Sequence, residues 1–251
     1  MTLGDARWEQ GNGRLSAADR WRYVLAAVGA QIGMFIDTLG PRRYRSSAIE
    51  RLDIARIEFP DTACAKAATE TLERAATPAI AHHSYRSYIW ASLLGQLDGR
   101  RWDAEVLYVA MMLHDLGPTD TFHGSCSCAQ CFTLDGVNAA PHVLASMAPD
   151  RAERIRRAVL LHLNVSVPGD VHGWEAHYVR AGTAMDIVGQ RYRDLPRRLI
   201  DATLDRHPRL NLKDEIVGWA AKESRLRPGS RMATLNRIGF SSFVRAAPYR
   251  S

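Results

Sequence analysis

The chain has 251 residues, of which 46% are hydrophobic and 24% charged, and it is long enough to bury a sizeable core as one domain. This composition is typical of a folded globular protein and excludes a chain that is disordered throughout. The formal net charge of +6 comes from arginines scattered along the sequence. Because no basic tract is present, we expect no nucleic-acid partner, whereas an anionic substrate remains compatible with the charge.

Residues 1–61 are expected to form an arm, a helix and a linker packed on the domain that follows. The polar, glycine-containing residues 1–16 predict a loose arm. A helix should begin at Ser16 and carry the apolar stretch 23–36. This stretch is shorter than the roughly 18–20 apolar residues of a membrane span and has no signal-peptide pattern, so it predicts a packed helix in a cytoplasmic protein. A role for it in an interface or a homo-oligomer stays open.

The region 62–195 reads as one helical domain, and 196–251 as a helical tail of the same domain. Apolar residues recur three and four apart in several segments, and none alternates as a strand does. The predicted fold class is therefore all-α. The expected helices of the domain cover residues 62–75, 81–97, 106–117, 135–147, 151–163 and the surroundings of residue 186.

One predicted helix ends in two adjacent groups that can bind a metal ion. The apolar run VLYVAMML leads directly into His114 and Asp115, and Gly117 and Pro118 stop the helix there. An imidazole nitrogen and a carboxylate oxygen suit Zn²⁺, Fe²⁺, Mn²⁺ or Co²⁺. The alternative is a histidine that merely stabilises a helix C-terminus, since a single His-Asp pair is common.

Two further helical segments hold candidate partners, His83 upstream and Asp186 downstream. An H…HD…D order on three separate helices resembles the HD-domain metal-dependent hydrolases, and within them the branch that includes cyanamide hydratases. The resemblance spans residues 62–248 and is carried by His83-Ser84-x-Arg86, LHDLG at 113–117, DGVNAA at 135–140, LLHLN at 160–164 and GTAMDIVG at 182–189. It implies an HD-domain helical bundle with helical N- and C-terminal extensions. It also implies that His83, His114, Asp115 and Asp186 ligate one divalent ion, with Zn²⁺ expected before Fe²⁺ or Mn²⁺.

Three other residues are predicted to serve the reaction beside Asp115. Arg86 lies on the same helix face as His83 and could hold a carboxylate or a substrate oxygen. Asp120 stands in the loop that starts at the predicted metal site and could transfer protons or support a ligand. His162 ends an apolar helix as His114 does, and it is expected to face the activated water or the substrate without ligating the metal. A solvent-facing position at the helix end is the alternative for His162.

The loop after the HD motif contains a possible second metal site. His123, Cys126, Cys128 and Cys131 could hold a structural Zn²⁺, or the cysteines could remain free thiols. This cluster departs from the family pattern. Residues 132–134 lack the additional histidine of the two-metal members, which favours a single catalytic ion.

These residues predict an enzyme that activates water on a metal ion and adds it to a small-molecule substrate. The resemblance suggests a hydratase or hydrolase acting on a small polar molecule, with cyanamide or another nitrile-like compound as the substrate. The first alternative is a nucleotide or other phosphate-ester phosphohydrolase. A di-iron oxygenase on the same scaffold and a sensor or binding module without catalysis are further alternatives.

Overall fold

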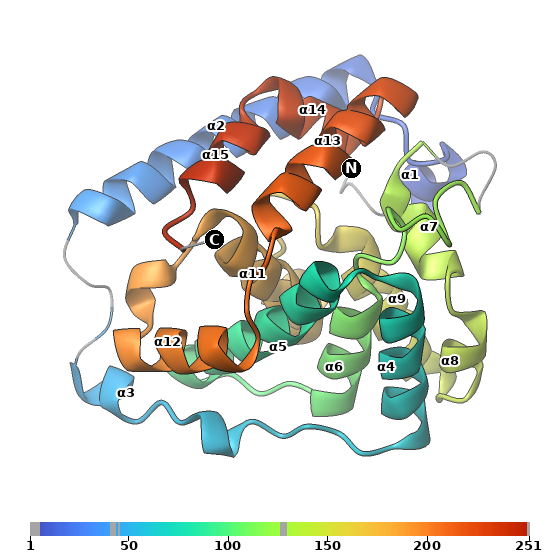
Figure 1. Ribbon diagram of the computed structural model, residues 1–251. Helices are drawn as coiled ribbons and strands as arrows, with labels where there is room; N and C mark the ends of the chain where they lie inside the picture. The colour runs from blue at the N-terminus through green and yellow to red at the C-terminus, as the bar shows by residue number, and fades with distance from the viewer. Residues whose placement is uncertain (1–5, 41–43, 45, 126–129, 250–251) are drawn as a thin grey trace.

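The computed structural model describes residues 6–40, 44, 46–125 and 130–249. Over these ranges the chain forms fifteen α-helices and two short 3₁₀ helices, with no strand (Figure 1). The predicted all-α fold class is therefore confirmed. None of the described helices is both long and apolar enough to span a bilayer.

Two long helices, α5 (Pro78–Asp98) and α11 (Trp174–Val188), pack along each other at the centre of the molecule (Figure 1). They are flanked by α4 (Ala63–Ala75), α6 (Ala104–Leu113) and α9 (Pro149–Leu161). α5 is buried on almost every side, because its apolar residues are spread around its whole circumference. Thr77 caps its N-terminus and Pro78 occupies the first turn, so the helix begins three residues before the predicted start at residue 81.

Gly182 of α11 sets how closely α5 and α11 approach. A Cβ atom at this position would lie 2.2 Å from the carbonyl oxygen of Ser87 and 3.0 Å from the Cβ of Ala91. The two backbones can meet at this distance only because glycine has no side chain. One helical turn further along α11, Asp186 faces the same helix, so this contact also positions the candidate site.

The helix predicted over residues 135–147 is two helices in the structure. α7 (Phe132–Asn138) ends before Ala140, and α8 (Pro141–Ala145) begins at a proline in its first turn. Proline has no backbone N–H and clashes with the preceding turn, so it can start a helix but not continue one. The predicted single helix was therefore wrong at Pro141. The remaining short helices are α3 (Ser46–Glu50), η1 (Ile54–Arg56), α10 (Gly169–His172), η2 (Tyr192–Asp194) and α12 (Arg197–Arg206).

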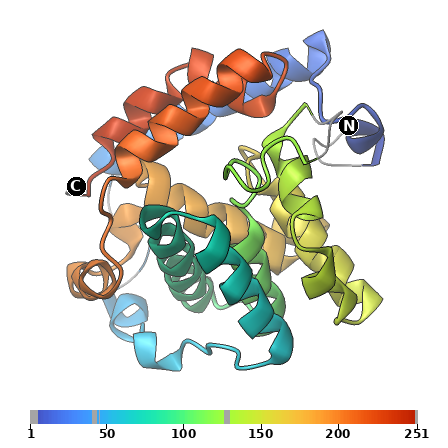
Figure 2. The ribbon, with the colours of Figure 1, turned by 45° about the vertical axis from the view of Figure 1, so that its right-hand side comes forward.

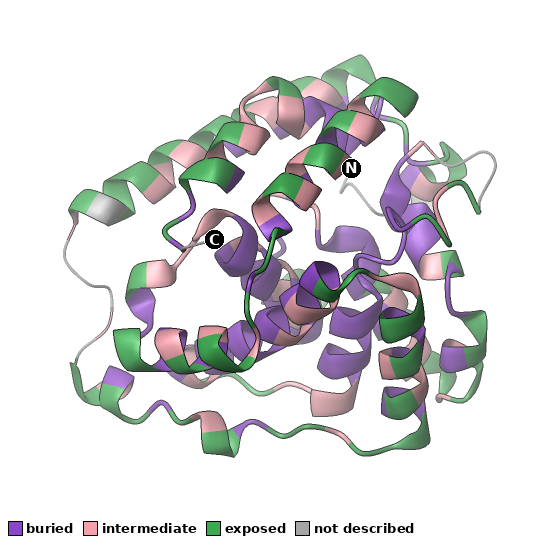
Figure 3. Ribbon diagram, viewed as in Figure 1, coloured by how far each residue is buried: buried purple, intermediate pink, exposed green. Residues whose placement is uncertain are grey.

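Helices from the two ends of the chain lie together over one side of the central bundle (Figures 1 and 2). From the N-terminal part comes α2 (Ala17–Leu39), and from the C-terminal part come α13 (Leu212–Leu226), α14 (Arg231–Arg237) and α15 (Phe240–Ala246). α14 contacts α2, while α13 and α15 reach α5 and α11. These helices carry many exposed residues, whereas α5 and α6 are mostly buried (Figure 3).

The expectation of a loose N-terminal arm is wrong for the described part of that arm. Residues Ala6–Gln10 form a short helix, α1, and both Trp8 and Leu15 are buried. The guanidinium of Arg231 stacks 4.3 Å from the ring centre of Trp8. A tryptophan is large enough for its burial to offset the ordering of a short segment, which the polar composition around it does not reveal.

Replacing Gly182 with alanine should lower the free energy of unfolding by about 2 kcal/mol or more, because the new methyl group collides with the α5 backbone. Gly218→Ala is the matched control, since its Cβ meets nothing within 4 Å and alanine favours the helix by up to about 1 kcal/mol. Urea denaturation of both variants measures the difference. Equal stability of the two variants would contradict the close packing of α5 on α11.

Candidate metal centre

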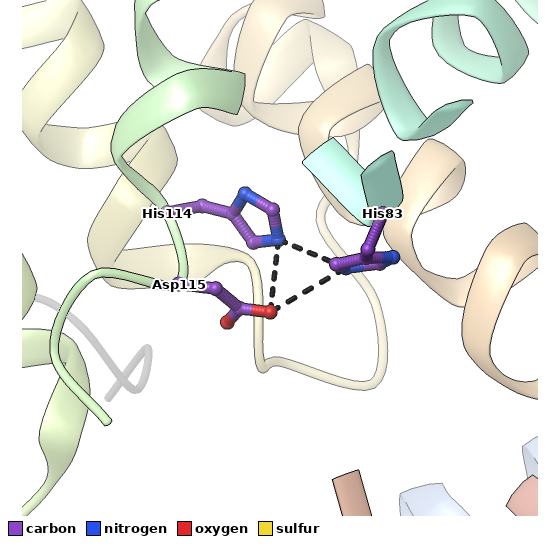
Figure 4. Close-up of side chains that lie close together, drawn as sticks. All are labelled: His83, His114 and Asp115. Carbon is purple, nitrogen blue, oxygen red and sulfur yellow. Dashed lines mark hydrogen bonds and ion pairs between the residues drawn. The ribbon is translucent and has the colours of Figure 1, made fainter. Parts of the chain in front are cut away.

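Three side chains converge at one buried point between α5 and the end of α6 (Figure 4). His83 comes from α5, and His114 and Asp115 follow directly after the last residue of α6. The Nε2 atoms of the two histidines are 3.2 Å apart. The Oδ2 atom of Asp115 lies 3.4 Å from Nε2 of His83 and 3.2 Å from Nε2 of His114.

The dimensions of this triangle fit a divalent metal ion. Three ligand atoms bound at 2.0–2.1 Å on the corners of a tetrahedron stand about 3.3–3.4 Å apart. The observed edges of 3.2, 3.2 and 3.4 Å agree with that spacing. Among the described residues this is the one group of three or more potential ligands that lies close enough to share an ion. His83, His114 and Asp115 are therefore the residues that could hold a metal.

His114 is oriented by the end of its own helix. The last carbonyl groups of an α-helix have no partner within the helix. The Nδ1–H of His114 donates to one of them, the carbonyl of Met111, at 2.7 Å. This hydrogen bond fixes the tautomer, so the lone pair of Nε2 faces Asp115 and His83.

His83 is oriented by Asp186 of α11, which lies behind the imidazole ring. The Oδ2 atom of Asp186 is 2.8 Å from Nδ1 of His83, on the side of the ring away from the three converging atoms. The prediction that Asp186 is a fourth ligand is therefore corrected: its carboxylate holds the ligand His83 in place. The physical reason is that Asp186 is already fully engaged by donors from α5.

The role predicted for Arg86 is corrected in part. Its Nε and Nη2 atoms each donate to the Asp186 carboxylate at 2.8 Å, and Nη1 donates to the carbonyl groups of His207 and Pro208. The side chain is fully buried. Arg86 was predicted to bind either a carboxylate or a substrate oxygen. It binds a carboxylate, but this carboxylate is that of Asp186 and not that of a substrate.

Asp120 is not part of the site. Its side chain is 98% exposed and pairs with Lys222 at 3.0 Å on the surface. The loop that begins at the HD motif turns outward before it reaches this residue, so the predicted proton-transfer role of Asp120 is wrong.

His162 lies in the wall of the cavity beside Asp115. It follows the end of α9 as His114 follows α6, and its Nδ1–H donates to the carbonyl of Val159 at 2.6 Å. Its Nε2 atom is then free to accept a proton and lies 3.5 Å from Oδ1 of Asp115. Burial lowers the pKa of His162, so the neutral imidazole is favoured near pH 7.

The electrostatics of the centre favour an ionised aspartate. Burial by itself raises the pKa of the Asp115 carboxyl, but the surrounding histidines, His114 first among them, hold that pKa well below its usual range. A carboxylate that stays charged is the protonation state in which Asp115 can ligate a metal ion.

A cavity of about 160 Å³ opens from these residues toward the helices that come from the two ends of the chain. α2, α11, α13, α14 and α15 all contribute to its walls, so the extensions form a roof over the centre. Most of the lining is apolar and includes Ala27, Met34, Phe132, Ile187, Ile216, Trp219, Met232, Phe240 and Phe243.

Two ionisable residues of this cavity were not predicted from the sequence. Glu223 of α13 is buried, its Oε1 accepts from Nε2 of His123 at 2.9 Å, and its Oε2 has no hydrogen-bond partner among the described residues. Burial raises the pKa of Glu223. Arg180 of α11 is the second, and burial lowers its pKa to about 10. Glu223 lies on the same buried helix face as Leu212, Ile216 and Ala220. A carboxylate at an apolar position of a helical pattern is the feature by which the sequence could have indicated this residue.

The predicted zinc site in the loop after the HD motif is described only in part. Cys126 and Cys128 lie outside the described residues. His123 contacts Glu223, whereas Cys131 is buried as a free thiol beside Thr133 and Arg231. The two described members therefore have different neighbours, and the zinc prediction stays untested.

Substitution of a ligand and substitution of the residue behind a ligand should affect metal binding differently. His114→Ala should abolish binding of one divalent ion per chain, because a corner of the triangle is lost. Asp186→Asn should retain the ion with about 10- to 100-fold weaker affinity, because all three ligands remain and the change at the metal centre is a looser orientation of His83. Metal analysis and zinc titration of the purified variants, with circular dichroism as a check of folding, measure both effects. If a folded Asp186→Asn protein binds as little metal as His114→Ala does, Asp186 is a metal ligand after all.

No protein-family model matches this chain, and a search of curated proteins finds no match. What the centre can do chemically is therefore inferred from its own atoms. They form a buried His-His-Asp triangle that can hold a metal ion, next to the imidazole of His162 and an apolar cavity.

Proposed function

We propose that the protein is a metal-dependent hydratase or hydrolase that adds water to a small organic molecule, with a nitrile-type group as the preferred electrophile. The observation that supports this most directly is the juxtaposition of the metal-capable triangle with Nε2 of His162 at one end of an apolar cavity. Zn²⁺ is the ion proposed, because the two nitrogen donors and one oxygen donor have tetrahedral spacing.

A divalent ion held by His83, His114 and Asp115 would lower the pKa of a water molecule and polarise an electrophile beside it. The side chains of the protein supply the remaining steps. His162 offers an unprotonated Nε2 atom that can accept a proton from the water and return it to the nitrogen of the substrate. Asp115 lies 3.5 Å from that atom and stabilises the imidazolium formed in between.

The cavity walls indicate what kind of substrate fits. Apolar side chains bind an apolar substituent and provide few partners for a strongly hydrated molecule. We therefore infer a substrate with a compact electrophilic group at the metal and a small apolar body beneath the roof helices. Glu223 is the carboxyl group on α13 that could form a hydrogen bond with the distal part of such a molecule.

A nucleotide phosphohydrolase receives less support. Such enzymes bind phosphate groups with several cationic side chains. Arg180 is the one arginine among the described lining residues of the cavity, and it already donates to Gln190 and to the carbonyl of Asn164. Arg86, which the sequence made available for a phosphate, is fully engaged by Asp186.

A substrate panel with the zinc-loaded protein tests the proposal. Turnover of nitriles is expected, and each apolar methylene that the cavity accommodates should raise kcat/KM by about fourfold. Cyanamide, aliphatic and aromatic nitriles and nucleotides should be compared under identical conditions. Efficient phosphate release from a nucleotide, with no hydration of any nitrile, would refute the proposal.

His162→Ala should lower turnover by at least about tenfold while metal content stays near one ion per chain, since His162 moves protons and does not ligate. Asp120→Asn is the matched control and should leave turnover unchanged, because Asp120 is on the surface. Steady-state rates and metal analysis are measured on the same preparations. Loss of the ion from His162→Ala would mean that His162 is a ligand.

A further inference from the structure

The outward face of α2 carries an apolar stripe that the single chain leaves in solvent. Seven large apolar side chains of this helix are between 38% and 75% exposed: Trp21, Leu25, Val28, Ile32, Phe35, Ile36 and Leu39. These are seven of the eleven exposed large apolar residues in the described part of the chain. An ordinary surface helix turns polar residues outward, so an apolar stripe with this exposure indicates a surface for a binding partner.

The spacing of the stripe identifies a helix as that partner. Residues 21, 25, 28, 32, 35 and 39 are separated alternately by four and three positions, which is the spacing of a coiled-coil seam. At 1.5 Å per residue the seam is about 27 Å long. Gly29 lies beside it, and a Cβ atom there would meet nothing within 4 Å, so another backbone can approach closely.

Two copies of this stripe match each other when the two helices run antiparallel. Positions 21 and 39, 25 and 35, and 28 and 32 are equidistant from residue 30. A two-fold axis beside residue 30 therefore places each apolar side chain of one helix opposite a counterpart on the other. The only charged residues between Trp21 and Leu39 are Arg22 and Asp37. Antiparallel pairing brings these opposite charges together, whereas parallel pairing would bring like charges together.

We propose that α2 forms an antiparallel helix pair with α2 of a second copy of this chain, giving a two-fold symmetric dimer. Side chains of this size and exposure offer on the order of 800 Å² per chain, which is what a stable interface of standard size buries on each partner. A membrane surface fits less well, because membrane-bound amphipathic helices carry several lysines or arginines along their polar face. The charge-free stretch 23–36 lacks such residues.

The pairing would also support the cavity described above. The inner face of α2 supplies Ala27, Ala30 and Met34 to the cavity wall, while its outer face supplies the seam. Dimerisation would therefore hold one wall of the cavity in position from outside. The dimer itself depends on no assumption about the metal or the reaction.

Sedimentation velocity of the full chain should give a species of twice 28.0 kDa at micromolar concentration. Leu25→Arg and Phe35→Glu, each alone, should weaken the dimer at least about a hundredfold, because each change occurs twice in a two-fold interface. The double variant Leu25→Arg/Phe35→Glu should restore it, since position 25 then meets position 35 of the partner with opposite charge. Val171→Arg, which changes an exposed apolar residue on α10, should leave the dimer unaffected.

Three results would overturn the proposal. A wild-type chain that sediments as a monomer at all concentrations up to about 100 μM would exclude the dimer. Single variants that dimerise as the wild type does would place the interface elsewhere. A double variant that stays monomeric while each single variant remains folded would exclude the antiparallel register. Sedimentation with vesicles of neutral and anionic phospholipid separates a monomer that binds membranes from one that does not.

Discussion

The buried carboxylate of Asp186 is the interaction on which the rest of the structure depends. It accepts hydrogen bonds from Arg86 through two atoms, from Nε1 of Trp90 at 3.0 Å and from Nδ1 of His83, and Arg209 approaches to 3.3 Å. Removing one partner of a fully buried ion pair typically costs about 3–5 kcal/mol, because the other charge is left without compensation. These contacts therefore hold α5 against α11. They also orient the imidazole of His83, which could ligate a metal ion.

The centre also depends on how two helices end. His114 and His162 each follow an apolar helix and each donate Nδ1–H to a carbonyl three residues earlier. The helix ends would otherwise leave these carbonyl groups unpaired within the core, at a cost of about 1–3 kcal/mol each. At each of these two positions, one hydrogen bond thus stabilises the helix end and also selects the tautomer whose Nε2 atom faces the cavity.

In the proposed function, the central helices supply the metal-capable residues and the helices from the two ends of the chain supply most of the cavity walls. His83, His114 and Asp115 come from the central helices, where rigid packing sets their spacing. The cavity roof comes from α2 and from α13 to α15, and its residues would select the substrate. Changes in the roof can alter what fits without moving the metal-capable atoms. The same roof carries Glu223, which the sequence pattern of the central domain could not reveal.

The sequence by itself determined the helical fold and the position of His114 and Asp115 at the end of an apolar helix, whereas His83 was added to them by the H…HD…D resemblance. Apolar spacing sets which residues of a helix enter the core, and a histidine and an aspartate after such a run are delivered to its end. Only the tertiary structure decided the place of Asp186 behind His83, the engagement of Arg86 and the exposure of Asp120. Helical periodicity gives the face on which a side chain lies, but not which helix packs against that face or which donor reaches the carboxylate first. Those choices follow from the packing of α5 on α11 and from the chain ends folding over the bundle.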